Sequence, residues 1–137
     1  PRVQEGRFLA EHFTPSAMID VSDGLVQDLS HILKASKVGA SLDLEKIRVS
    51  SEAKRLAQGN CRKALGRALS DGEDFELLFT VSPRHKRMLE KNWTKKFPKV
   101  PLSWIGRICG KTSRIAWRRD GKKVAAPKLA QKGFSHF

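Results

Sequence analysis

The alternation of apolar and polar positions along the chain predicts short helices and strands in a mixed order. Some segments repeat apolar residues every three or four positions, which indicates amphipathic helices, whereas others alternate or form short apolar runs, which indicates strands. Pro15 is expected to end the first helix, and Asp120-Gly121 is typical of a two-residue hairpin turn. The expected helices cover residues 3–13, 24–35, 51–69 (broken near Gly59) and 83–95. The expected strands cover residues 17–21, 40–44, 75–81, 102–108, 114–119 and 122–125.

Strands and helices do not alternate strictly, which favours an α+β fold, a mixed β-sheet layered with α-helices, over a doubly wound sheet. The length of 137 residues suits one domain around one core, or one piece of a larger protein. Residues 17–21 and 75–81 are apolar enough to be buried strands. In a chain without tyrosine, we expect the tryptophans to form core; they are Trp93, Trp104 and Trp117.

Composition excludes several classes of protein. Hydrophobic residues make up 39% and charged residues 30%, which is the balance of a soluble globular domain. No apolar run approaches the roughly 20 residues that span a bilayer, and no signal-peptide pattern opens the chain, so no membrane partner is expected. Cys61 and Cys109 lie far apart and are expected to be small hydrophobic side chains in a reducing, cytoplasmic environment. Pro1 fits both removal of an initiator methionine and a cut from a longer chain.

Charge is distributed unevenly along the chain. Residues 1–82 carry eleven basic and twelve acidic residues, whereas residues 83–123 carry fourteen basic and two acidic ones, and the net charge is +13. Clustered cations with aromatic residues between them can bind nucleic acid. No helix-turn-helix, zinc-finger or RNP pattern accompanies the charge, so a solvated basic face, or one that meets an acidic partner domain, is the simpler explanation. Nucleic-acid binding therefore remains an alternative rather than the main hypothesis.

The segment Asp20-Val21-Ser22-Asp23-Gly24-Leu25 is the sharpest candidate for chemistry, because it places two carboxylates and a hydroxyl between an expected strand and an expected helix. Asp20 and Ser22 lie two residues apart, so their side chains point the same way in an extended segment, and Ser22 or Asp23 can serve as the N-cap. A helix N-terminus attracts anions, but these carboxylates would repel a phosphate unless a divalent cation stood between them. Mg²⁺ suits that task, whereas plain helix capping is the competing structural explanation.

Asp71-Gly72-Glu73-Asp74-Phe75-Glu76 is a second acidic cluster, placed directly before an apolar strand. Four acids in six residues are costly unless solvent or cations compensate them, and a solvent-exposed turn is the competing explanation. The segment from Gly106 to Thr112 looks like a phosphate-binding P-loop. However, only three residues separate its glycines where four are required, and a strand follows where a helix should. We therefore expect Gly110-Lys111-Thr112 to form a turn.

Three segments resemble the C-terminal half of the thiamine-monophosphate kinases: residues 17–25, residues 72–80, and the ending Gly133-Phe134-Ser135-His136-Phe137. The resemblance runs over about residues 1–137 and implies a fold like the C-terminal domain of aminoimidazole ribonucleotide synthetase. It implies that residues 1–137 form a single substrate- and metal-binding domain, and that the N-terminal ATP-binding domain of the family is absent from this chain. It also implies a homodimer in the complete enzyme.

The family transfers the γ-phosphoryl group of ATP to thiamine monophosphate with the help of Mg²⁺, so the resemblance implies these two substrates and this ion. It implies no catalytic base, because a phosphate acceptor with a second pKa of about 6 is already ionised at pH 7. It assigns Mg²⁺ to Asp20 and Asp23, ATP to Ser22, and thiamine monophosphate to Glu73, Asp74 and Phe134. Two interpretations follow: part of a phosphotransferase that is inactive when taken alone, or a basic nucleic-acid-binding module without catalytic activity.

Overall fold

The structure is a computed structural model that describes residues 2–70 and 76–128. Its helices are α1 (Val3–His12), α2 (Leu25–Ser36), α3 (Ser51–Leu56), α4 (Cys61–Ser70) and α5 (Lys86–Lys96), with single 3₁₀ turns η1 (Leu44–Lys46) and η2 (Pro83–His85). Its strands are β1 (Ala17–Val21), β2 (Gly39–Asp43), β3 (Glu76–Thr80), β4 (Gly106–Cys109), β5 (Ile115–Arg119) and β6 (Lys122–Val124). Most of these elements lie within one or two residues of the positions that the apolar pattern predicts.

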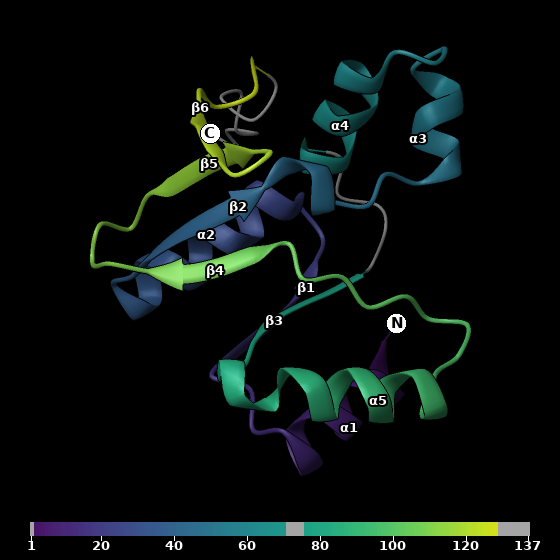
Figure 1. Ribbon diagram of the computed structural model, residues 1–137, viewed down its shortest axis with the longest axis vertical. Coiled ribbons are helices and arrows are strands. Elements are labelled where there is room, and N and C mark those ends of the chain that lie inside the picture. The colour runs from purple at the N-terminus through teal and green to yellow at the C-terminus, as the bar shows by residue number, and fades with distance from the viewer. Residues whose placement is uncertain (1, 71–75, 129–137) are drawn as a thin grey trace.

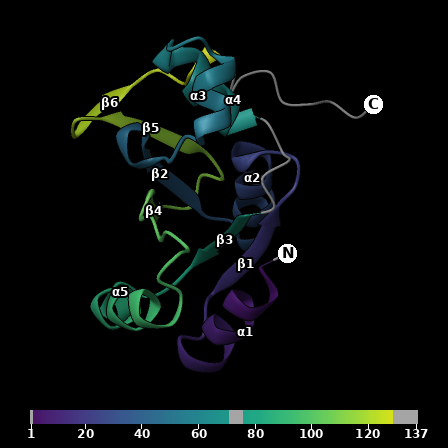
Figure 2. The same ribbon diagram turned by 90° about the vertical axis from the view of Figure 1, so that its right-hand side faces the viewer.

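The strands form two sheets, which confirms the α+β class but differs from the single mixed sheet that we expected. β1 and β3 pair antiparallel as a two-stranded sheet. The other four strands lie in the order β4-β2-β5-β6, with β2 antiparallel to β4 and parallel to β5. In Figure 1 the four-stranded sheet has α2 behind it, while α1 and α5 lie at the opposite end of the molecule. Figure 2 shows β1 and β3 running between these two parts.

Each of the two parts has its own hydrophobic cluster as its core. The first joins α2 and α4 to the four-stranded sheet and includes Leu33, Leu69 and Trp117. The second joins α1 to α5 and includes Phe8, Leu9, Phe13, Leu89 and Trp93. β3 contacts both, because alternate side chains of a strand point to opposite faces: Leu78 packs against the first cluster, whereas Leu77 and Phe79 pack against the second.

The expectation of two buried strands at residues 17–21 and 75–81 is wrong. Along β3, Glu76 is exposed and the other four residues are half-buried, and β1 has alternating half-buried and exposed positions before Val21. The reason is that β1 and β3 pair only with each other among the described strands, so both have an open edge. Their apolar composition reflects contact with the two clusters rather than the complete burial of a central strand.

The expected strand 102–108 is only partly correct, because β4 begins at Gly106. The residues before it pass from one hydrophobic cluster to the other: Leu102 and Trp104 pack against the second cluster, and Ile105 packs against the first. The Asp43 amide, at the end of β2 in the four-stranded sheet, donates a hydrogen bond to the Ile105 carbonyl, 2.8 Å long.

Other expectations for side chains are mixed. Trp93 and Trp117 are core residues, as expected, whereas Trp104 is half-buried and its Nε1 donates to Glu90 Oε1 at 2.6 Å. Cys61 and Cys109, which we expected to be small hydrophobic side chains, are free and exposed: Cys61 is the first residue of α4, and Cys109 is the last residue of the edge strand β4. No helix within the described ranges combines the length and the apolar character needed to cross a membrane.

Candidate functional site

The loop between β1 and α2 carries the most distinctive chemistry of the chain. β1 ends at Val21 and α2 begins at Leu25. Asp20 and Ser22 are exposed, and Val21 between them is buried, which is the alternation of an extended segment. The prediction that Asp20 and Ser22 share one side is therefore confirmed, and this side faces solvent. Asp23 is exposed as well, so all three side chains are accessible to a ligand.

Neither Ser22 nor Asp23 caps helix α2, which corrects that expectation. The N-cap residue is Gly24, with φ +107° and ψ 147°, and no side chain makes a capping hydrogen bond to the helix. A Cβ atom built at Gly24 would lie 2.8 Å from the carbonyl oxygen of Ser70, at the end of α4. Glycine is required here for two reasons, because other residues rarely adopt this backbone conformation and because no side chain fits against α4.

Asp28 is the residue that our sequence reasoning missed. An acidic residue of an amphipathic helix normally faces solvent, but Asp28 is only 2% exposed. Its Oδ2 atom accepts hydrogen bonds from the backbone N–H of Ser22 at 2.9 Å and of Asp23 at 3.1 Å. The arrangement follows the logic of a capping box, in which an acidic side chain in the first helical turn reaches back to a backbone N–H before the helix. The sequence signal that could have revealed this role was the position of Asp28, an acidic residue in the first turn of the helix.

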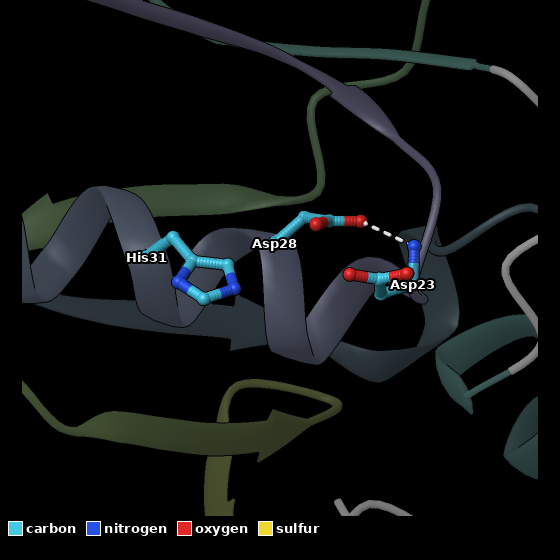
Figure 3. A group of neighbouring side chains, drawn as sticks. All are labelled: Asp23, Asp28 and His31. Atoms are coloured by element: carbon cyan, nitrogen blue, oxygen red, sulfur yellow. Dashed lines mark hydrogen bonds between the residues drawn. The ribbon is translucent and has the colours of Figure 1, made fainter. Parts of the chain in front are cut away.

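Asp23, Asp28 and His31 form a group whose potential ligand atoms all lie within 4.8 Å of one another, as Figure 3 shows. Asp28 and His31 come from α2, and Asp23 comes from the preceding loop. Carboxylate oxygens are the donors that Mg²⁺ prefers, and an exposed Asp23 leaves room for the water ligands that this ion keeps. The exposed carboxylates of the loop, those of Asp20 and Asp23, therefore fit Mg²⁺. Asp20 is not a member of this group of three.

Glu76, the last residue of the second acidic segment, lies at the same end of the two-stranded sheet. In the register of β1 with β3, Asp20 pairs with Leu77 and Val21 pairs with Glu76. The start of β3 therefore lies beside the end of β1, although more than fifty residues separate them in the sequence. The predicted substrate residues Glu73 and Asp74, which precede β3, and Phe134, near the C-terminus, lie outside the described residues.

A cavity of about 690 Å³ adjoins the loop, with Val21 and Leu25 from either side of it in the wall. This volume is within the usual range of roughly 300–1,000 Å³ for small-molecule sites. Arg2, Arg48 and Glu76 supply charges of both signs to the wall. Arg2 forms an ion pair with Glu76, with Nη2 3.1 Å from Oε1, and this hydrogen bond is the main cause that raises the pKa of Arg2 above its ordinary value.

The rejected P-loop is a turn, as expected. The segment between β4 and β5 contains Gly110 at φ +60°, and the chain continues into β5 at Ile115 rather than into a helix. A Cβ built at Gly110 would have no neighbour within 4 Å. The segment lacks the helix that must follow a phosphate-binding P-loop.

No protein-family model matches the chain. Over 99% of its length it is 38% identical to the thiamine-monophosphate kinase of Rhodopirellula baltica, and it covers 41% of that protein. It spans about two fifths of the curated relatives that it matches. The solved structure of thiamine-monophosphate kinase from Stenotrophomonas maltophilia superposes with a TM-score of 0.72 at 34% identity, over 90% of this chain and 36% of that one. The structure of AaThiL complexed with AMPPCP and TMP superposes with a TM-score of 0.65 at 29% identity, over 99% and 38% of the two chains.

Proposed function

We propose that this chain, which corresponds to the C-terminal part of the thiamine-monophosphate kinases, supplies metal- and substrate-binding groups for an ATP-dependent transfer of a phosphoryl group to thiamine monophosphate. The observation that carries the proposal is the loop from Asp20 to Asp23, which presents accessible carboxylates next to Val21 and Leu25, two residues that line a cavity of about 690 Å³. The similar structure bound to AMPPCP, an ATP analogue, and to TMP supports the choice of the two substrates. The relatives support this interpretation over the nucleic-acid-binding alternative.

The loop is better suited to hold a cation than to bind phosphate directly. Two of its backbone N–H groups, those of Ser22 and Asp23, already donate to Asp28 and cannot serve a phosphate at the same time. The exposed side chains that remain are mainly carboxylates, which repel polyphosphate and attract Mg²⁺. We propose that Asp20 and Asp23 hold Mg²⁺ and that the hydroxyl of Ser22 contacts ATP. When bound, Mg²⁺ would neutralise the charge that develops on the transferred phosphoryl group.

The acceptor, thiamine monophosphate, has to be held in the right position but needs no general base, because its phosphate is largely ionised at neutral pH. We propose that Glu73 and Asp74 bind thiamine monophosphate and that Phe134 lies against its aromatic part. These two acids precede β3 in the sequence, and the first residue of β3, Glu76, pairs with Val21 beside the metal-binding loop, which supports a substrate site near the metal. The chain would then supply the acceptor's position and part of the metal site, whereas alignment with the donor, the main requirement of phosphoryl transfer, would need the complete enzyme.

The arrangement of the complete protein is part of the same proposal. We propose that residues 1–137 are one domain of the aminoimidazole ribonucleotide synthetase C-terminal type, that a separate N-terminal domain binds most of the nucleotide, and that the complete enzyme is a cytoplasmic homodimer. The similarity to solved thiamine-monophosphate kinases supports this arrangement, since the chain aligns with little more than a third of their length.

The experiment replaces Asp20 and Asp23, separately, by asparagine in the full-length enzyme and measures thiamine diphosphate formation across a range of Mg²⁺ concentrations. Each variant is expected to lose at least about 100-fold in rate, because even residues behind the metal ligands usually cost 10–100-fold. Asp120→Asn is the matched control, since Asp120 is an exposed aspartate in the hairpin turn before β6. Turnover of the Asp20 and Asp23 variants near that of Asp120→Asn at every Mg²⁺ concentration would contradict the assignment.

A further inference from the structure

We infer that Asp28 is a positioning residue, which holds the backbone of Ser22 and Asp23 in the conformation that binds Mg²⁺, without itself touching ATP or thiamine monophosphate. The inference rests on the proposed function of the Asp20–Asp23 loop. Asp28 is almost completely buried, and its proposed role differs from that of the exposed Asp20 and Asp23, which are proposed to bind the ion directly.

The burial of Asp28 needs an explanation. A buried carboxylate costs several kcal/mol unless hydrogen bonds or opposite charges compensate it. Asp28 is 2% exposed, and its Oδ2 atom is 2.9 Å from the amide nitrogen of Ser22 and 3.1 Å from that of Asp23. Hydrogen bonds to an ionised carboxylate are about twice as strong as bonds between neutral groups. These two bonds are the compensation, and they tie the buried group to the exposed loop.

The loop is held from two sides. On one side, Asp28 in the first turn of α2 binds the amides of Ser22 and Asp23. On the other side, Gly24 lies so close to the end of α4 that a Cβ would be 2.8 Å from the Ser70 carbonyl oxygen. Only three residues separate β1 from α2, so these two contacts leave the loop little freedom. A metal site whose ligands are held in place before binding loses less entropy when the ion arrives.

The position of Asp28 also has an electrostatic consequence. Its carboxylate lies in the group with Asp23 and His31, whose potential ligand atoms are all within 4.8 Å of one another, and Figure 3 shows its oxygen directed at the Asp23 amide rather than into solvent. A negative charge directly behind the exposed Asp23 favours a cation there. Carboxylates in such a place, next to metal ligands, typically change metal affinity or activity 10–100-fold when they are mutated.

The test compares Asp28→Ala and Asp28→Asn in the full-length enzyme. We expect Asp28→Ala to raise the Mg²⁺ concentration for half-maximal rate by about 10–100-fold. Asp28→Asn keeps a carbonyl oxygen that can accept the N–H bonds, so its shift is expected to be clearly smaller. Ile32→Val is the matched control, because Ile32 lies one turn further along the same face of α2, is 8% exposed and has no polar side-chain atom to hold the loop. It is expected to lose stability without a change in Mg²⁺ dependence.

A second measurement does not depend on activity. Hydrogen exchange of the peptide that contains Ser22 and Asp23 is followed by mass spectrometry in the metal-free enzyme. We expect faster exchange in Asp28→Ala and exchange close to wild type in Asp28→Asn. If Asp28→Ala does not fold, the asparagine variant still decides, because a positioning role predicts that it keeps both the protected amides and most of the Mg²⁺ affinity.

The outcomes separate this inference from the proposed function. If Asp20→Asn and Asp23→Asn leave Mg²⁺ dependence unchanged, the proposed function fails. If those variants lose it but Asp28→Ala changes neither Mg²⁺ dependence nor exchange, only the inference is overturned. It is also overturned if exchange rises while Mg²⁺ dependence stays the same. A loss in Asp28→Asn as large as that in Asp23→Asn would make Asp28 a metal ligand, and the positioning role would then be wrong.

Discussion

The substitution Gly24→Ala tests the geometry of the candidate site through stability. Gly24 has φ +107° and ψ 147°, a backbone conformation that is nearly restricted to glycine and costs other residues about 1–3 kcal/mol. A Cβ would also lie 2.8 Å from the oxygen and 2.9 Å from the carbon of the Ser70 carbonyl, and 3.1 Å from the Leu69 oxygen. These are backbone atoms that cannot rotate away, and such overpacking costs about 1–3 kcal/mol. We expect a total loss of about 2–6 kcal/mol.

Gly59→Ala is the matched control. Gly59 also has a positive φ, of +76°, but a Cβ there would have no neighbour within 4 Å. Its strain of about 1–2 kcal/mol is partly offset, because alanine lowers the entropy of the unfolded chain by about 0.4–1 kcal/mol. The difference between the two variants therefore isolates the contact between the loop and the end of α4.

The assay is urea unfolding followed by tryptophan fluorescence, since Trp93 and Trp117 are buried and report on one hydrophobic cluster each. With a slope of about 2 kcal/mol per molar urea, Gly24→Ala is expected to lower the unfolding midpoint by roughly 1–3 M, and Gly59→Ala by less than about 0.8 M. Equal midpoints for the two variants would refute the reasoning, because α4 would then not press against the loop.

Two further predictions concern ligand binding and catalysis. In the full-length enzyme, Phe134→Ala is expected to raise the Michaelis constant for thiamine monophosphate and to leave that for ATP nearly unchanged, because the ring is proposed to contact the thiamine part. Steady-state kinetics measure this, and a large loss of thermal stability with unchanged kinetics would instead make Phe134 a core residue. The chain by itself, mixed with ATP, Mg²⁺ and thiamine monophosphate, is expected to form no thiamine diphosphate above a blank that contains only the metal, because it offers no P-loop to align the nucleotide. Chromatography of the product tests this, and multiple turnovers would show that the chain is catalytically complete.

Local sequence patterns predicted most elements of this fold. Apolar spacing located the five helices to within a few residues, and Asp120-Gly121 correctly marked the turn between β5 and β6. The same local reasoning found the loop from Asp20 to Asp23, because two acids and a serine between a strand and a helix are visible in the sequence. Such features depend on neighbours within one or two turns of the chain, where backbone geometry and side-chain spacing are the dominant constraints.

Pairing between distant segments was decided by the tertiary structure. The sequence does not state that Val21 pairs with Glu76, which brings the start of β3 beside the end of β1, or that β2 runs parallel to β5. It also suggested deep burial for β1 and β3, because an apolar strand looks the same whether it is central in a wide sheet or paired with one neighbour. Register and sheet width depend on contacts that local patterns do not contain.

The sequence by itself determined which groups can do chemistry here: the acids of the loop, their place before a helix, and the surplus of cations in the second half. The tertiary structure decided how the loop is held. Asp28 looks like one more polar residue of an amphipathic helix, yet it is buried and binds two backbone amides, and Gly24 is required because α4, more than forty residues later, presses against it. The physical reason is that burial and close approach depend on which surfaces pack together, and packing joins residues that the order of the chain keeps apart.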